Sequence, residues 1–323
     1  MARDVPTVMG VVPGDELGTT LMHEHVFVLD PQLDRDLPHP EWDEEAAVTA
    51  ARDTFARLAE LGIRTVVDLT VPGIGRDVAR VRRAAEGAPV HIVAATGWYA
   101  THALPPYFGT HGPGRLLAGA DPLEELFVRD LEEGIAGTGV RAAVVKVVSD
   151  VAGLTPDVTR VFSAAAAAHR RTGAPIMTHS HAASHGGVPQ QDLLAAHGVA
   201  LDRVVIGHCG DTDDLDYLRR LADRGSYLGF DRFGMEHVQS DEVRIATLLA
   251  LLELGYAERI VLSHDAAVFS RVTPPSWRAR VTPRWRMDHL PTTVLPRLSD
   301  AGVDDATLAT LMVANPRRIL EAA

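Results

Sequence analysis

The stretch Ala142-Ala-Val-Val-Lys-Val-Val148 is the most informative about the fold, because it is apolar on both faces except for one lysine. A half-buried strand alternates apolar and polar residues, whereas a strand of a parallel sheet is covered on both faces and is apolar throughout. We therefore predict that residues 142–148 form a buried strand of a parallel sheet, with Lys146 in the interior.

Seven similar runs lie elsewhere in the chain. Each is short and apolar, and longer stretches with helical spacing separate them, which is typical of βα units. With 142–148 they make eight strands, the number that a closed (β/α)8 TIM barrel needs. The seven are residues 20–26, 63–69, 90–95, 174–178, 203–207, 226–229 and 259–263.

The segments between the strands indicate one α/β domain. Residues 44–61 and 157–172 have helical spacing and are followed by Gly62 and Gly173, which suit helix C-caps. Residues 304–320 form a third predicted helix, and Asp304 suits its N-cap. Residues 7–18 suit a small hairpin, which places an N-terminal hairpin unit within 1–18. No low-complexity linker divides the chain, so we expect a single domain over 1–323.

Two segments after the third and eighth strands are too long for simple turns. Residues 96–122 are rich in Gly, Pro and aromatics, and residues 266–291 hold five arginines. Both leave the carboxyl ends of their strands, where barrel active sites lie, so we expect the 266–291 loop to be an active-site lid. The five arginines are Arg271, Arg278, Arg280, Arg284 and Arg286.

Composition excludes several classes of function. The 323 residues carry a formal charge of −12, which disfavours nucleic acid or an anionic membrane surface as the main partner. Cys209 is the only cysteine, so an intrachain disulfide is excluded. The chain starts without the apolar core of a signal peptide and has no apolar run of spanning length. We expect a soluble, cytoplasmic protein.

His23-Glu24-His25 closes the first predicted strand. Because strand side chains alternate, both imidazoles point to one face and Glu24 to the other. Two histidines one pleat apart form a chelating pair for a metal ion, although two hydrogen-bonded core histidines are about equally compatible with this pattern.

Lys146 is unusual because an isolated buried ammonium is costly. A neutral lysine amine can capture carbon dioxide, and the resulting carbamate can bridge two divalent metals. The alternative is a lysine that extends from the strand end to solvent or pairs with a carboxylate.

Three further metal-ligand types stand at strand ends. His179 and His208 end the fifth and sixth strands, and Asp265 follows the eighth. Each alone suits a capping or loop residue, but a barrel brings all these ends together. Histidine and carboxylate ligands without thiolates suit Zn²⁺, Co²⁺, Mn²⁺ or Fe²⁺, so we predict a two-metal hydrolase.

Long motifs in this order resemble the phosphotriesterase family of the amidohydrolase superfamily, particularly its phosphotriesterase-like lactonases, over nearly the whole chain. The matching stretches are Leu21-Met-His-Glu-His25, Val66-Val-Asp-Leu-Thr70, Ala95-Thr-Gly-Trp-Tyr99, Gly173-Ala-Pro-Ile-Met-Thr-His179, Val205-Ile-Gly-His-Cys-Gly-Asp211, Gly229-Phe-Asp-Arg-Phe-Gly234, Leu262-Ser-His-Asp265 and Asn315-Pro-Arg-Arg318.

The resemblance implies a role for each residue of the site. One metal, the more buried, would be held by His23, His25 and Asp265, and the other by His179 and His208. Carboxylated Lys146 and a hydroxide would bridge the two ions. The hydroxide would attack a lactone carbonyl, and Asp265 would take its proton and pass it toward the leaving alkoxide.

By the same resemblance, Tyr99 would orient the substrate or hydroxide. Arg232 matches the lactonase branch, where specialised organophosphate hydrolases carry a histidine. Lactones, γ, δ or N-acyl-homoserine, are therefore expected as substrates, with phosphotriesters as side substrates. Asp211 would be an outer carboxylate of the site, or else a turn residue. The family also suggests a homodimer.

The lid would contribute aromatic side chains to substrate binding: Trp98, Phe269, Trp277 and Trp285. Its arginines are more numerous than expected for a long acyl chain, and one of them would meet an anionic substrate group or all would face solvent. Cys209 is expected to pack, and His181, His185 and His264 to lie outside the ligand set. Two alternatives stay open: an amidase or deacylase of the same superfamily, and a binding protein without turnover.

Overall fold

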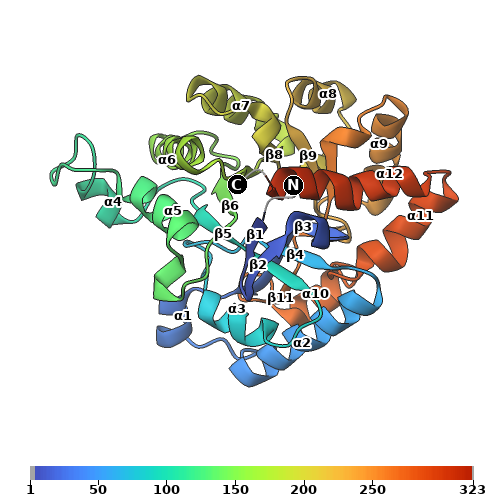
Figure 1. Ribbon diagram of the computed structural model, residues 1–323, viewed down its shortest axis with the longest axis horizontal. Helices are drawn as coiled ribbons and strands as arrows, with labels where there is room; N and C mark the ends of the chain where they lie inside the picture. The colour runs from blue at the N-terminus through green and yellow to red at the C-terminus, as the bar shows by residue number, and fades with distance from the viewer. Residues whose placement is uncertain (1–3, 322–323) are drawn as a thin grey trace.

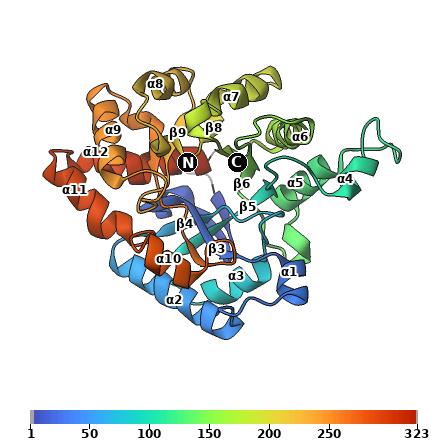
Figure 2. The ribbon, with the colours of Figure 1, turned by 180° about the vertical axis from the view of Figure 1, so that it is seen from behind.

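The computed structural model describes residues 4–321 and shows a (β/α)8 barrel, with parallel strands inside a ring of helices (Figure 1). Figure 2 shows the same ring from behind. The nine barrel strands are ordered β10-β9-β8-β7-β6-β5-β4-β3-β11. They are β3 (Thr20–Val28), β4 (Thr65–Asp68), β5 (His91–Trp98), β6 (Val144–Val148), β7 (Ile176–His179), β8 (Val204–Ile206), β9 (Tyr227–Phe230), β10 (Ile260–Leu262) and β11 (Ala267–Ser270).

All eight predicted strands are present, and the ninth, β11, corrects the prediction for the eighth. Strand β10 pairs with β9, whereas β11 pairs in parallel with β3, with Ala267 opposite His25. Residues 263–266 separate β10 from β11, so the eighth strand of the barrel is divided in two by a kink. The first residues of the predicted 266–291 lid are therefore a strand, because they complete the closure of the barrel.

The N-terminal hairpin is shorter than predicted and lies earlier. It comprises β1 (Asp4–Thr7) and β2 (Gly10–Pro13), which pair antiparallel, and a 3-10 turn (Gly14–Glu16) follows. The bounds 7–18 were wrong because the first strand ends at Thr7, and Val8 and Met9 form the turn that leads into β2. Residues 1–3 of the predicted unit lie outside the described part of the chain.

Most helices follow the strands in the expected alternation, and α4 projects from the ring (Figure 1). Their bounds are α1 (Pro31–Asp36), α2 (Glu44–Glu60), α3 (Val78–Ala85), α4 (Pro106–Thr110), α5 (Pro122–Glu132), α6 (Pro156–Thr172), α7 (Gly187–Ala196), α8 (Leu215–Asp223), α9 (Asp241–Glu253), α10 (Pro275–Val281), α11 (Leu295–Asp300), α12 (Asp305–Ala309) and α13 (Asn315–Leu320). The two long segments expected to be irregular each contain a short helix, α4 in 96–122 and α10 in 266–291.

Helix ends follow the local chemistry of the sequence. The Asp43 carboxylate accepts a hydrogen bond from the Ala46 amide at the start of α2, and Asp304 does the same for Thr307 at the start of α12. Caps of this kind stabilise a helix by about 1 kcal/mol. Gly173 ends α6 with φ 81°, a left-handed conformation that favours glycine. The predicted helix 304–320 is interrupted by a π-helical segment, Thr310–Ala314.

The core has an inner and an outer layer, and the alternation of strand side chains explains both. On β6, Val145 and Val147 pack outward against the helices, whereas Val144 packs inside the barrel. Lys146 lies on the same inward face as Val144, since the two are separated by one residue. In residues 4–321, no helix has the length and apolar character needed to cross a bilayer.

Candidate metal centre and active site

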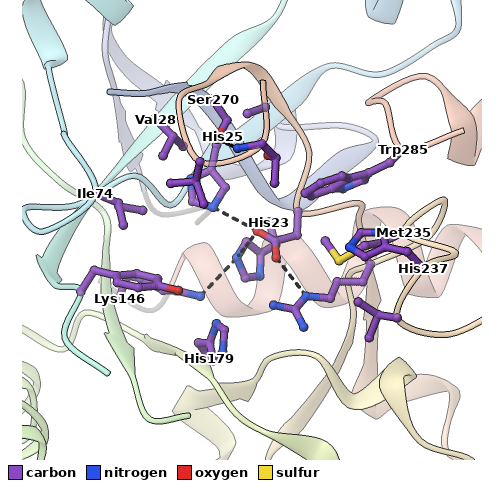
Figure 3. Close-up of a pocket in the computed structure, with 17 residues that line it drawn as sticks. His23, His25, Val28, Ile74, Lys146, His179, Met235, His237, Ser270 and Trp285 are labelled. Atoms are coloured by element: carbon purple, nitrogen blue, oxygen red, sulfur yellow. Dashed lines mark hydrogen bonds and ion pairs between the residues drawn. The ribbon is translucent and has the colours of Figure 1, made fainter. Parts of the chain in front are cut away.

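A cavity of about 320 Å³ lies where the carboxyl ends of the barrel strands meet. Four of the predicted metal ligands in its wall come from strands β3, β6 and β7: His23, His25, Lys146 and His179. In Figure 3 these four side chains converge on one region, while Trp285, Met235 and His237 lie on the other side. Asp265, Tyr99 and Arg232 also line the cavity.

The two histidines of β3 face the same carboxylate. His25 Nε2 lies 3.1 Å from Asp265 Oδ1, and His23 Nε2 lies 3.4 Å from the same oxygen. Asp265 comes from the kink after β10, some 240 residues further along the chain. These three residues can hold one metal ion together, as their ligand atoms lie within 4.8 Å of one another.

The second pair of histidines comes from β7 and from the turn after β8. His208 Nε2 lies 2.9 Å from His179 Nδ1. His208 follows β8, which ends at Ile206, has a left-handed backbone with φ 65°, and lies buried behind the cavity wall against His179. The imidazoles of His23 and His208 are stacked with their centroids 5.1 Å apart, so the two pairs are adjacent.

Lys146 lies between these groups and is 1% exposed. Its Nζ is 3.2 Å from His23 Nε2 and 3.3 Å from the Thr178 carbonyl oxygen. Burial lowers the pKa of this amine to about 8, and the nearby carboxylates of Asp265 and Asp231 limit the decrease. A substantial fraction of the amine is therefore neutral near physiological pH, which is the form that reacts with carbon dioxide.

Burial also favours the neutral form of three of the imidazoles. It lowers the pKa of His23 and His208 below the ordinary value and that of His179 to about 4. Burial alone would raise the pKa of Asp265, but His23, His25 and Arg232 hold it well below its usual range. The cavity therefore presents lone pairs of neutral histidines and one ionised carboxylate.

Three of the four histidines are oriented by a hydrogen bond on Nδ1, and His179 has a carboxylate near Nε2. Asp231 accepts from Nδ1 of His23 and of His208, at 2.8 and 2.9 Å, and also from the His208 amide. His25 Nδ1 contacts Thr70 Oγ1 at 2.8 Å, and His179 Nε2 lies 3.6 Å from Asp150. Partners of this kind fix the tautomer and direction of metal-ligating histidines.

Sequence reasoning did not identify Asp231, Thr70 or Asp150. The only available signal was position, since Asp231 ends β9 as the ligands end their own strands. His23, His208 and Asp231 are also close enough together to hold a metal ion. Because Asp231 already accepts from Nδ1 of both histidines, we assign this carboxylate an orienting role.

The donor set fits two divalent cations. Four imidazoles, one carboxylate and a desolvated amine lie close together, with no thiolate among them. Nitrogen and oxygen ligands of this type suit zinc, cobalt, manganese or iron. The arrangement would also leave the cations open toward the cavity.

Arg232 links Asp265 to Asp211. Its Nε donates to Asp265 Oδ2 at 3.0 Å and its Nη1 to Asp211 Oδ2 at 2.7 Å. Asp211 is not a free turn residue, because Oδ1 also accepts from buried Arg244 at 2.7 Å. Burial opposes the charged form of Arg232, but the two carboxylates raise its pKa above the ordinary value.

Tyr99 lies edge-on to His179, with ring centroids 6.0 Å apart. Burial, together with the charge of Asp265, raises its pKa to about 12. The phenol therefore keeps its proton at neutral pH and can donate a hydrogen bond into the cavity.

Of the four predicted lid aromatics, only Trp285 lines the cavity. Trp98 packs on Phe108 and Phe269 on Trp42, so both belong to the packing outside the cavity. Trp277 does not line the cavity itself, but it contacts His237, which does. The structure does not bring these three side chains to the cavity wall, because composition does not show which way a loop side chain points.

The five lid arginines do not line the cavity. Arg271 and Arg278 donate to backbone carbonyls, Arg284 pairs with Glu236, and Arg286 pairs with Asp288. Arg280 is exposed. The expectation that one of them meets an anionic substrate group therefore has no support, and apolar side chains line much of the wall: Val28, Ile74, Met235, Val238, Val272 and Trp285.

The remaining candidates lie outside the ligand set, as predicted. His181 and His185 face solvent, where they contact Ser184 and Asp214. Cys209 is buried and its thiol donates to the Ile206 carbonyl. His264 is fully buried behind the cavity and contacts Glu24.

Comparisons with known proteins agree with this geometry. The family model described as "Phosphotriesterase family" matches residues 3–320. A phosphotriesterase homology protein of Mycobacterium tuberculosis is 44% identical over 321 residues, 98% of each chain. An aryldialkylphosphatase of Saccharolobus solfataricus is 34% identical over 309 residues, 95% of this chain and 96% of the other. The solved structure of the phosphotriesterase from M. tuberculosis has a TM-score of 0.96 and 43% identity, covering 99% of this chain and 98% of that one.

Proposed function

The chain belongs to the phosphotriesterase family, and on that premise we propose that it is a binuclear metal-dependent hydrolase that opens lactones and acts on phosphotriesters as side substrates. One observation carries the proposal. Three histidines, an ionised aspartate and a desolvated lysine converge on one cavity at the strand ends, and His208 contacts His179 directly behind its wall.

We assign His23, His25 and Asp265 to one cation and His179 and His208 to the other. Lys146 would supply a ligand to both as a carbamate, formed when its neutral amine adds to carbon dioxide and releases one proton. Two divalent cations held this way supply a water of lowered pKa and polarise a carbonyl or phosphoryl oxygen. Zinc suits these ligands, as do cobalt, manganese and iron.

Asp265 is the proton acceptor in this proposal. Its carboxylate is ionised, faces the cavity and keeps its orientation because Arg232 Nε donates to Oδ2. It takes a proton from the attacking water and delivers it to the alkoxide that leaves as the ring opens. Tyr99 donates from its neutral hydroxyl and orients the substrate.

The wall of the cavity favours an uncharged substrate with an apolar chain. Arg232, which lines the cavity, is already bonded to two carboxylates, and the lid arginines are turned away. An apolar acyl chain can lie against Ile74, Met235 and Trp285. A lactone has this combination of a polarisable carbonyl and an apolar body, and it needs no cation for recognition.

A substrate panel with measured metal content tests the proposal. Protein loaded with zinc or cobalt should open γ- and δ-lactones with kcat/KM above that for a paraoxon-type triester, by about tenfold or more. The third arm contains N-acyl amino acids, because an amide carbonyl is a similar electrophile. Faster hydrolysis of the amides would favour the deacylase alternative, and full metal sites without turnover would favour a binding protein.

The homodimer and the cytoplasmic location stay predictions from the resemblance and the sequence. Sedimentation equilibrium at micromolar protein tests the first, and fractionation of the native cells tests the second.

A further inference from the structure

Glu24 stands between the two histidines of β3 but points to the opposite face of the strand. It is fully buried, and residues 263–266 supply four hydrogen bonds to its carboxylate. Oε1 accepts from Ser263 Oγ at 2.8 Å, from the His264 amide at 2.9 Å and from His264 Nδ1 at 2.5 Å. Oε2 accepts from the Ala266 amide at 2.9 Å. All four donors belong to the kink between β10 and β11.

This kink contains Asp265 in an unfavourable backbone conformation. Asp265 has φ 55°, a left-handed value that residues other than glycine rarely adopt. The amides on either side, of His264 and Ala266, both bond to Glu24, and the Asp265 amide donates to the His23 carbonyl at 2.9 Å. Three consecutive amides are therefore held by β3, and the turn directs the Asp265 side chain into the cavity.

The same turn holds one wall of the cavity. His264 Nε2 accepts from the Leu290 amide at 2.8 Å, which leaves the hydrogen on Nδ1 for Glu24. The His264 carbonyl accepts from Trp285 Nε1 at 2.8 Å. Displacement of Glu24 would therefore disturb both Asp265 and Trp285.

We propose that Glu24 is a positioning residue whose carboxylate imposes the left-handed turn at Asp265 and thereby places that ligand opposite His23 and His25. The tripeptide His23-Glu24-His25 then has two functions, because its inward side chains bind the metal and its outward side chain sets the third ligand. A glutamine cannot replace the carboxylate, since its NH2 group would face either Ala266 N–H or the three donors at Oε1. The effect on rate rests on the proposed function, whereas the effect on metal binding does not.

Cobalt binding to metal-free protein tests the proposal without any assumption about substrate. Glu24→Gln should weaken the tighter cobalt site by about 10- to 100-fold, the usual range for groups that orient ligands. It should also change the visible absorption of bound cobalt, because Asp265 no longer coordinates in the same direction. Unchanged affinity and an unchanged spectrum in the folded variant would overturn the proposal.

Asp130→Asn is the matched control. Asp130 is also a fully buried carboxylate of the barrel, but it is bonded to Arg76 and Thr96 rather than to the kink. Asp130→Asn should lower the thermal stability. Its cobalt affinity and cobalt spectrum should remain those of the native protein. If Asp130→Asn changed the cobalt spectrum as much as Glu24→Gln does, the effect of Glu24 would be general and the proposal wrong.

A double-mutant cycle with the substrate of the native enzyme provides the rate test. If Glu24 acts through Asp265, Glu24→Gln lowers kcat more than it changes KM and causes little further loss in an Asp265→Asn background. If the kcat losses of the two single variants multiplied in the double variant, Glu24 would act independently of Asp265, which would contradict the proposal. Absence of lactone turnover by the native protein would count against the proposed function only, since the cobalt result still decides the role of Glu24.

A second variant covers the case in which Glu24→Gln does not fold. Ser263→Ala removes one of the donors to Oε1, together with the acceptor of the His23 amide, while keeping a small side chain at a buried position. It should weaken cobalt binding by a few fold. A folded Ser263→Ala protein with native affinity and spectrum would overturn the proposal.

Discussion

Two buried aspartate–arginine pairs of this barrel have similar geometry and different surroundings. Asp130 of α5 forms an ion pair with Arg76, Nη1 to Oδ2 2.7 Å, accepts a hydrogen bond from Thr96 Oγ1 at 2.8 Å, and is fully buried. Asp265 accepts from Arg232 Nε at 3.0 Å, and its side chain is 13% exposed to the cavity. Both partners of Asp130 contact Oδ2, and no histidine is among them, whereas Asp265 keeps Oδ1 beside two imidazoles.

The difference shows that neither an ion pair nor a large cavity identifies a reactive site. A second cavity, of about 440 Å³, has Arg76 in its wall and exceeds the cavity at the strand ends, yet neither histidine nor lysine lines it. Reactivity requires groups with free lone pairs that face a common space. In this barrel the kink after β10 supplies that condition by turning Asp265 inward.

The largest expected effect distinguishes these two aspartates. Asp265→Asn should lower kcat by about 10³-fold or more, because the proton acceptor and a metal ligand are both impaired. Asp130→Asn should leave kcat within about twofold and lower the free energy of unfolding by about 3 kcal/mol, since it leaves Arg76 without its buried partner. Lactonase kinetics, metal content and urea unfolding of both variants check this. If folded Asp265→Asn kept the native kcat, Asp265 would not be the proton acceptor.

The next effect concerns Lys146, whose amine is buried among the histidines. Lys146→Ala should lose most of the bound metal and activity, because no anion remains to bridge the cations. Short carboxylates such as acetate or propionate should restore part of both by occupying the vacated space. Metal analysis and turnover with and without the added acid measure this. Full metal occupancy and full activity without any added acid would refute the bridging role.

The neutral histidines predict a stability that depends on pH. The pKa of His179 falls from 6.5 in the unfolded chain to about 4 in the folded one, so between these values the unfolded state binds more protons. This contribution, of up to about 3 kcal/mol, is complete above pH 6.5 and is lost as the pH falls toward 4. Thermal melts of metal-free protein between pH 4 and 8 measure it. His179→Asn should flatten the profile, and an equally steep profile in that variant would contradict the assignment.

The smallest effects separate the residues that line the cavity from those that do not. Trp285→Ala should raise KM for a lactone with a long acyl chain by about tenfold, equivalent to about 1.4 kcal/mol of lost contact. Arg280→Ser changes an exposed lid residue and should leave KM within about twofold. Steady-state kinetics with short- and long-chain lactones compare the two. A larger increase in KM for Arg280→Ser than for Trp285→Ala would contradict this prediction and would show that the lid closes over the substrate.

Much of the site was predictable because the underlying rules are local. The alternation of β3 places His23 and His25 on one face, and the strand ends place His179 and His208 near them. The same rules predicted that Lys146 is buried and that Glu24 points away. Strand periodicity depends only on neighbouring residues, so these inferences did not require knowledge of the remaining chain.

Other features depend on contacts between distant segments and were missed or misplaced. Asp231 and Asp150 are ordinary acidic residues until the histidines that they orient are known. Phe269 was predicted in the lid, but it packs on Trp42 because β11 continues the barrel there. The stretch 266–270 is too short and mixed for its pairing with β3 to be evident from composition.

Local spacing and side-chain chemistry were enough to predict the eight strands, the inward face of the first and the kinds of ligand at the strand ends. Contacts between distant segments were needed to find that β11 closes the barrel on β3, that Glu24 holds the turn at Asp265, and that Trp285 rather than its neighbours faces the cavity. These outcomes depend on hydrogen bonds and packing between residues about 240 positions apart, which local patterns do not encode.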